Sequence, residues 1–144
     1  MSNGILIVDD NANIRHLLRM FIESSTSFKV CGEAENGAEA IEKAKKLQPN
    51  LILLDLTLPG MSGTEASSVL RLVAPHVKII LFTMHADGVN QSLASIFRLD
   101  RVISKADSIS TLGEHIKALL TPVNGPTRRD DVTEANTTNR DRPS

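Results

Sequence analysis

The sequence predicts an α/β fold of the doubly wound kind, in which a parallel sheet is covered by helices on both faces. Short, unbroken apolar runs at residues 5–8 and 51–54 are typical of strands that are buried on both faces. Stretches with apolar residues at helical spacing alternate with these runs along most of the chain. At 144 residues, the chain has the length of one ordinary domain.

The first half of the chain contains three predicted strands with helices between them. Apolar residues recur at helical spacing after the first strand, and this pattern stops in the serine-rich segment 24–27. The next helical pattern stops at Pro49, because a proline disfavours helical geometry in the residue before it. The predicted elements are a strand at 5–8, a helix around 14–22, a strand at 28–32, a helix around 40–47 and a strand at 51–54.

The second half continues the alternation as far as residue 120. A helix is expected to end near Pro75, and the strand that follows includes the charged Lys78. The predicted elements are a helix around 66–73, a strand at 77–82, a helix around 89–97, a strand at 102–104 and a helix around 109–119. The whole prediction is therefore five parallel strands and five helices in a single domain, residues 1–120.

Residues 121–144 differ in character from the rest of the chain. They contain almost no apolar residues and three prolines, and their acidic and basic residues balance. Such a segment cannot bury enough apolar surface to offset the entropy of ordering it, so we expect a disordered polar tail. The balance of charge also argues against a basic arm that binds nucleic acid.

Charge and hydropathy exclude some classes of partner. A formal net charge of −1 and a pI near 6.4 give no electrostatic reason to expect nucleic acid or an anionic membrane. No apolar run approaches the ~20 residues that a membrane-spanning helix needs, and the N-terminus lacks the pattern of a signal peptide. We therefore expect a cytoplasmic protein without membrane insertion and without direct contact to nucleic acid.

Polar side chains follow four of the five predicted strands, at the point where the strand ends. They are Asp9 and Asp10 after the first strand, Asp55 after the third, Thr83 after the fourth and Lys105 after the fifth. The carboxyl ends of parallel strands meet at one edge of the sheet, where ligands bind in open α/β folds. One aspartate after a strand is commonly a helix N-cap, but an acidic pair with a third acid and a lysine favours a site.

The residue types at this edge predict metal-assisted phosphoryl chemistry. Converging carboxylates are costly unless a cation neutralises them, and Mg²⁺, which takes one or two carboxylates and keeps waters, suits such a cage. Asp55 is the candidate nucleophile, and Asp9 and Asp10 are the candidate metal ligands. The hydroxyl of Thr83 and the ammonium of Lys105 would contact a newly formed anion. Phosphoryl transfer depends mainly on positioning and charge neutralisation, which this set provides.

The sequence resembles a response-regulator receiver domain over residues 5–120. The resemblance is carried by residues 7–11 (IVDDN), 55–63 (DLTLPGMSG), 81–85 (LFTMH) and 103–107 (ISKAD). It implies a flavodoxin-like fold and phosphorylation of Asp55 by a sensor histidine kinase or phosphotransfer protein. It also implies Mg²⁺ held by Asp10, Asp55 and the backbone carbonyl of Thr57, with Asp9 acting through water.

The resemblance further implies a signalling module. Thr83 and Lys105 would contact the phosphoryl group and shift the face formed by the fourth helix, the fifth strand and the fifth helix. A downstream protein partner would bind this face. No enzymatic activity is expected beyond self-dephosphorylation of Asp55.

Several residues depart from the receiver pattern, all of them on this output side. Val102 stands where most receivers have tyrosine or phenylalanine, and the chain contains no Tyr or Trp. Arg98 and Arg101 replace glycines, and Ala106 replaces a proline that often follows the lysine. Since valine has few rotamers, we expect the usual aromatic switch to be missing. His85 lies two residues after Thr83 and is a candidate for modulating water access to the phosphoryl group.

Three other functions remain as alternatives. A haloacid-dehalogenase-like phosphatase also uses an aspartate nucleophile and Mg²⁺, but it would need a second aspartate at the position of Thr57. A flavin carrier on the same fold would need a phosphate-binding loop where the acidic pair Asp9 and Asp10 would repel the phosphate. A receiver kept only as a phosphorylation-independent interaction scaffold would retain the acidic residues and lack a working switch at Val102.

Overall fold

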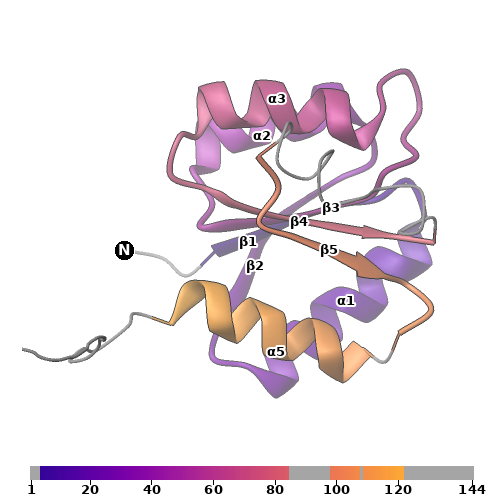
Figure 1. Cartoon of the computed structure of the whole chain (residues 1–144), viewed down its shortest axis with the longest axis vertical. Coiled ribbons are helices and arrows are strands. Elements are labelled where there is room, and N and C mark those ends of the chain that lie inside the picture. The colour runs from indigo at the N-terminus through magenta and orange to yellow at the C-terminus, as the bar shows by residue number, and fades with distance from the viewer. Residues whose placement is uncertain (1–3, 85–97, 108, 122–144) are drawn as a thin grey trace, which may run out of the picture.

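The computed structural model describes residues 4–84, 98–107 and 109–121, which form one parallel sheet with helices on both faces (Figure 1). Its strands are β1 (Gly4–Val8), β2 (Lys29–Ala34), β3 (Leu51–Leu54), β4 (Lys78–Thr83) and β5 (Arg101–Ser104). Their order is β2-β1-β3-β4-β5, and every neighbouring pair is parallel. The predicted doubly wound, five-stranded sheet is confirmed.

Helices cover both faces of this sheet. The described helices are α1 (Ala12–Ser25), α2 (Gly37–Leu47), α3 (Gly63–Val73) and α5 (Ile109–Leu120). In Figure 1, α2 and α3 lie on one face of the sheet, and α1 and α5 lie on the other. The helix predicted around residues 89–97 lies outside the described residues, as do residues 122–144 of the predicted tail.

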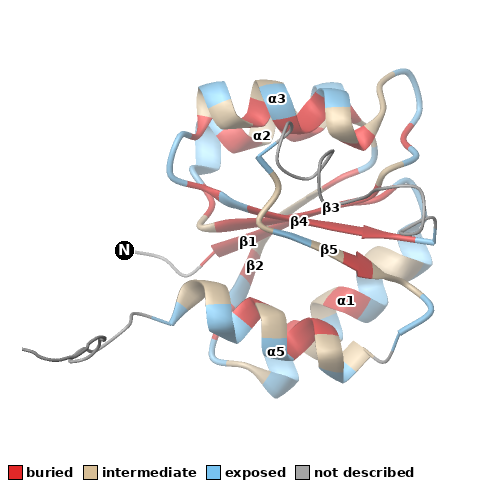
Figure 2. Ribbon diagram, viewed as in Figure 1, coloured by how far each residue is buried: buried red, intermediate tan, exposed pale blue. Residues whose placement is uncertain are grey.

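Two apolar clusters hold the layers together, one on each face of the sheet. Successive residues of a strand point to opposite faces, so Leu6 and Val8 pack with α2 and α3, whereas Ile5 and Ile7 pack with α1 and α5. All four side chains are almost completely buried, and Figure 2 shows the same burial along the strands and the inward faces of the helices. This accounts for the unbroken apolar run in the sequence.

β2 continues two residues beyond the predicted end at residue 32. It lies at an edge of the sheet, where one side has no strand partner, so its sequence does not need to be uniformly apolar. The register shifts between Ile5 and Leu6, which pair with Val30 and Gly32, so the strand bulges at Cys31 and then continues to Ala34. β4 and β5 also differ by one residue from their predicted bounds.

Two described residues other than glycine have a positive φ. Gln48, at the C-terminus of α2, has φ 46°, and its side-chain amide donates hydrogen bonds to the carbonyls of Ala44, Lys45 and Val73. Arg98 has φ 58° and an exposed side chain. Its carbonyl accepts hydrogen bonds from the guanidinium of Arg71.

The strand β5 is anchored at its start by an ion pair. Arg71 Nη2 lies 2.7 Å from Asp100 Oδ2, and the same carboxylate oxygen accepts the Ile79 N–H at 2.8 Å. These contacts hold the beginning of β5 beside β4, so the carboxyl ends of the two strands are in register.

Among the helices that the structure describes, none has the length and apolar character needed to cross a membrane.

Candidate functional site

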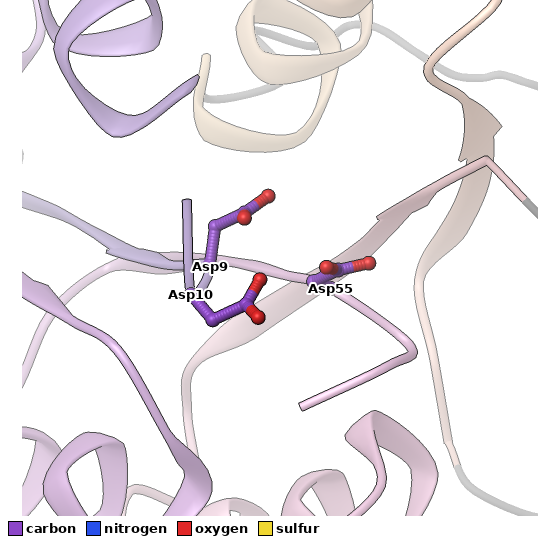
Figure 3. Close-up of side chains that lie close together, drawn as sticks. All are labelled: Asp9, Asp10 and Asp55. Atoms are coloured by element: carbon purple, nitrogen blue, oxygen red, sulfur yellow. The ribbon is translucent and has the colours of Figure 1, made fainter. Parts of the chain in front are cut away.

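Three aspartates meet at the carboxyl edge of the sheet. Asp9 and Asp10 follow β1, and Asp55 follows the neighbouring strand β3. Each offers a carboxylate oxygen, and these oxygens lie within 4.8 Å of one another around a common space (Figure 3). Asp9 and Asp55 are buried, with 2% and 8% of their surfaces exposed, whereas Asp10 is exposed.

None of these aspartates is the N-cap of a helix. The side chain of Asn11 caps α1 by accepting hydrogen bonds from the N–H groups of Asn13 and Ile14. Ser62 caps α3 in a capping box with Glu65. Capping therefore does not explain the acidic residues, and the interpretation as a binding site is the one that fits.

Lys105 brings a cation to the acidic cluster. Its Nζ lies 2.5 Å from Asp9 Oδ2 and 3.4 Å from Asp55 Oδ2, and its side chain is 12% exposed. The backbone N–H of Lys105 donates to the carbonyl of Thr83 at 2.8 Å, which continues the pairing of β5 with β4 beyond the end of β5. The lysine thus partly neutralises two buried carboxylates, as burial of charge requires.

The carboxyl group of Asp55 is harder to ionise than an ordinary aspartate. Burial raises the pKa of Asp55, the positive charge of Lys105 opposes that rise, and the negative charge of Asp9 adds to it. A hydrogen bond from the backbone of Thr57 also favours the ionised form, but the net shift is upward. A divalent cation beside Asp55 would favour ionisation, so the donor set fits a hard metal ion such as Mg²⁺.

The backbone of Asp55 is fixed from two sides. Its N–H donates to the carbonyl of Val8 at 3.0 Å, which ties it to β1. On the other side, Gly63 packs so closely that a Cβ at this position would overlap the carbonyl oxygen of Asp55. Only glycine allows the first turn of α3 to approach the Asp55 backbone in this way.

The other predicted site residues differ in how they are placed. Thr83 is fully buried as the last residue of β4. Thr57 is exposed, two residues after Asp55. Val102, in β5, is partly buried against the apolar cluster under α2 and α3. His85 lies outside the described residues.

A cavity of about 360 Å³ opens beside the acidic cluster. Its lining combines the charged residues of the site with apolar residues, which include Leu17 of α1 and Met84 after β4, both more than half exposed. The lining residues are Asp9, Asp10, Asn11, Ile14, Leu17, Leu18, Asp55, Phe82, Met84, Lys105, Asp107 and Ile109.

Sequence reasoning missed a charged network behind the acidic pair. Arg15 Nη1 donates to the backbone carbonyl of Asp9 at 2.6 Å, and Arg15 Nε lies 2.9 Å from Glu33 Oε1. Arg19 Nε binds the other oxygen of Glu33 at 2.8 Å. Glu33 lies near the carboxyl end of β2, as the other site residues lie near the ends of their strands, and a prediction that carried β2 to Ala34 would have singled it out.

The sequence matches the family model described as response regulator receiver domain over residues 5–117. It is 41% identical over 120 residues to the chemotaxis protein CheY of Thermotoga maritima, a match that covers 76% of this chain and 99% of CheY. It is 32% identical over 113 residues to the response regulator protein VraR of Staphylococcus saprophyticus, which covers 78% of this chain. The chain spans about half of the length of VraR, 54%.

Solved structures of similar fold include two from Thermotoga maritima. The response regulator domain of CheB superposes with a TM-score of 0.75 at 27% identity, covering 86% of this chain and all of that one. The response regulator protein TrrA, in a complex with Mg²⁺ and BeF, superposes with a TM-score of 0.73 at 32% identity, covering 83% of this chain and all of TrrA.

Proposed function

The chain belongs to the response regulator receiver family, and on that premise we propose that Asp55 accepts a phosphoryl group from a phosphohistidine donor, with Mg²⁺ beside it. Receiver domains of this kind act in two-component systems, and this one is similar to CheY. The observation that carries the assignment of Asp55 is that its buried carboxylate lies within 4.8 Å of the two other carboxylates and 3.4 Å from the Lys105 ammonium.

The transfer step needs an ionised Asp55. A carboxylate oxygen of Asp55 attacks the phosphorus atom, the bond from phosphorus to the donor nitrogen breaks, and that nitrogen keeps the electron pair. Lys105 lies close enough to Asp55 to neutralise charge on the oxygens of the transferred group. Mg²⁺, when bound, supplies further neutralisation and favours the ionised form of Asp55.

The contacts of the acidic pair support different roles for its two members. Both oxygens of Asp9 are engaged: Oδ2 by Lys105, and Oδ1 by the N–H of Asn11 at 2.9 Å. Asp10 is exposed, and no hydrogen bond or ion pair from a described residue holds its carboxylate. We therefore assign the direct metal contact to Asp10 and Asp55, with the backbone carbonyl of Thr57 as a third ligand and Asp9 acting through water.

The proposed roles of Thr83 and Lys105 follow from their positions at the ends of β4 and β5. A phosphoryl group on Asp55 would contact the Lys105 ammonium and the Thr83 hydroxyl, so both β4 and β5 would respond to phosphorylation. The proposed partners are a sensor histidine kinase or phosphotransfer protein upstream and another protein downstream. A cytoplasmic location is part of the same proposal.

A phosphoacceptor describes the site better than a phosphatase. A CheY-like receiver domain is phosphorylated and is not itself an enzyme. Some relatives have an enzyme name, such as the protein-glutamate methylesterase of Methanosarcina acetivorans, but that protein is much longer than the region that matches this chain. The position two residues after Asp55 is occupied by Thr57, which cannot act as the second acid that a haloacid-dehalogenase-like phosphatase requires.

Phosphorylation of the full chain by phosphoramidate, with and without Mg²⁺, tests the proposal. Intact-mass measurement should show one added phosphoryl group on the wild type in Mg²⁺ and none on Asp55→Asn. The matched control is Asp107→Asn, which removes another acid that lines the same cavity and should remain labelled. Labelling of Asp55→Asn to the wild-type extent would refute the assignment. In the same assay, Asp10→Ala should raise the Mg²⁺ requirement more than Asp9→Ala.

A further inference from the structure

We propose that Arg15 is a positioning residue that orients Asp10 toward the metal through the peptide group between Asp9 and Asp10. The inference rests on the proposed function, because it assumes that Asp10 is a metal ligand. It adds a residue of α1 to the site that neither contacts the metal nor touches the phosphoryl group. Arg15 would act by fixing the backbone from which the Asp10 side chain projects.

The contact itself is short and well enclosed. Arg15 Nη1 donates to the carbonyl oxygen of Asp9 at 2.6 Å, and the Arg15 side chain is only 16% exposed. On the other side of the same residue, the Asp9 N–H donates to the carbonyl of Ala34 at 3.0 Å. The main chain of Asp9 is therefore held both by the neighbouring strand and by a guanidinium, and the second bond is charge-assisted.

Asp10 depends on this backbone because its side chain has no other support among the described residues. Asp9 is fixed by Lys105 and by the N–H of Asn11, whereas the Asp10 carboxylate is exposed and has no such bond. The direction of the Asp10 side chain is consequently set by the plane of the preceding peptide group. Arg15 binds the oxygen of that peptide group, so loss of the contact would let the plane rotate.

Glu33 holds Arg15 in place. Its carboxylate binds Arg15 through one oxygen and Arg19 through the other, and its backbone carbonyl accepts a hydrogen bond from Lys43 Nζ. Burial acts to raise the pKa of Glu33, but the hydrogen bonds and charges of Arg19 and Arg15 outweigh burial and lower it. Glu33 is thus an ionised anchor that links α1 and α2 to the loop after β1.

Arg19 offers a matched control for Arg15. Both residues belong to α1, both carry one positive charge, and both bind Glu33, at 2.9 Å and 2.8 Å. Only Arg15 also reaches the Asp9 carbonyl. A variant of either residue therefore removes one salt bridge to Glu33. Arg19 also forms a half-exposed pair with Glu23 on the same helix at 3.8 Å, which is remote from the Asp9 backbone, so the contact with the Asp9 carbonyl is the difference that bears on the site.

Charge and orientation predict opposite effects on metal binding. Removing a positive charge close to a cation site strengthens cation binding by Coulomb's law. Releasing the peptide group before Asp10 weakens binding, because the ligand must then be ordered when the metal arrives. A loss of Mg²⁺ affinity in Arg15→Gln would therefore oppose the electrostatic trend and could not result from the charge change.

Isothermal titration of the full chain with MgCl₂ tests the inference without any phosphorylation step. Arg15→Gln should weaken Mg²⁺ binding about tenfold, at the lower end of the range for residues that orient a metal ligand. Arg19→Gln should bind Mg²⁺ as tightly as the wild type or slightly more tightly. Circular dichroism melting of each variant establishes that it is folded at the temperature of the titration.

A second pair keeps the net charge and covers the case in which Arg15→Gln does not fold. Arg15→Lys cannot bind both Glu33 and the Asp9 carbonyl as a guanidinium fork does, so it should weaken Mg²⁺ binding, whereas Arg19→Lys should not. Equal Mg²⁺ affinity in the two lysine variants, or tighter binding by Arg15→Gln, would overturn the inference and leave the role of Asp55 intact. A wild type that does not bind Mg²⁺ would overturn both proposals.

Discussion

Replacing Arg98 with glycine should stabilise the domain. Arg98 has φ 58°, in the left-handed region that glycine adopts freely and that a residue with a Cβ adopts at a cost. Its side chain is exposed, and the contact that the residue makes with Arg71 uses its backbone carbonyl. Arg98→Gly therefore removes the strain and keeps the interaction that anchors this turn.

The size of the effect depends on two opposing contributions. Left-handed backbone in a residue other than glycine costs roughly 1–2 kcal/mol. Glycine has more conformational freedom than arginine in the unfolded chain, which stabilises the unfolded state of the variant by about 0.5–1 kcal/mol and offsets part of this gain. The net gain is about 0.5–1 kcal/mol in the free energy of unfolding, or roughly 2–5 °C in Tm for a domain of this size.

Gln48 is the matched control, since it is the other described residue apart from glycine with a positive φ. Gln48→Gly relieves the same kind of strain, but it also deletes the side-chain amide that binds the carbonyls of Ala44, Lys45 and Val73. At about 0.5–1.5 kcal/mol for each typical hydrogen bond, this loss exceeds the gain. Gln48→Gly should therefore destabilise the domain by roughly 0.5–4 kcal/mol.

Urea unfolding followed by circular dichroism measures both variants, since a shift in midpoint at constant slope reports a change in stability. A rise in midpoint for Arg98→Gly and a fall for Gln48→Gly is the expected pattern. A destabilised Arg98→Gly would show that contacts of the arginine side chain stabilise the fold by more than the strained backbone costs.

Three further predictions concern charge and output. Asp55→Asn should raise Tm at pH 7 without Mg²⁺, because burial raises the folded-state pKa of Asp55 and its ionisation therefore destabilises the fold. The gain in Tm should vanish at a pH below the pKa of Asp55 in the unfolded chain. An equal or lower Tm at pH 7 would contradict this prediction. Glu33→Gln should lower stability at pH 7, because the folded-state pKa of Glu33 is depressed. Melting curves should show that the difference in stability between wild type and variant shrinks as pH falls through that pKa. A loss of stability that persists in acid would point to lost packing. Beryllofluoride should change self-association only weakly in analytical ultracentrifugation, because Val102 cannot perform the aromatic rotamer change, and a clear shift from monomer to dimer would refute this.

The sequence predicted well which side chains gather at the carboxyl edge of the sheet, because they follow the ends of strands. Asp9, Asp55 and Lys105 come together because the carboxyl ends of β1, β3 and β5 lie at one edge, and a parallel sheet enforces this alignment. β1 and β3 are buried on both faces, so their apolar runs stop clearly where Asp9 and Asp55 begin. The assignment of these three residues needed little more than the strand ends.

Residues of the bulged edge strand β2 and of the helix surface could not be found in this way. β2 lies at the edge and contains a bulge, so its apolar pattern ended early and Glu33 was not assigned to the sheet. Arg15 lies on the polar side of an amphipathic helix, where an arginine is ordinary in any sequence. Its importance comes from a tertiary contact with the Asp9 carbonyl, which no local pattern encodes.

Because Gly63 packs closely against Asp55, the α3 side of the site is more rigid than the β5 side. On the α3 side, the backbone of Gly63 packs directly against the backbone of Asp55, and the N–H of Gly63 donates to the Leu56 carbonyl at 2.7 Å, so the first turn of α3 is held tightly against this segment. On the β5 side, Lys105 reaches the acidic cluster through a long, flexible side chain. A new charge on Asp55 would therefore have tightly packed backbone on the α3 side and a flexible side chain on the β5 side. We expect the resulting displacement of the protein to be directed toward β4 and β5.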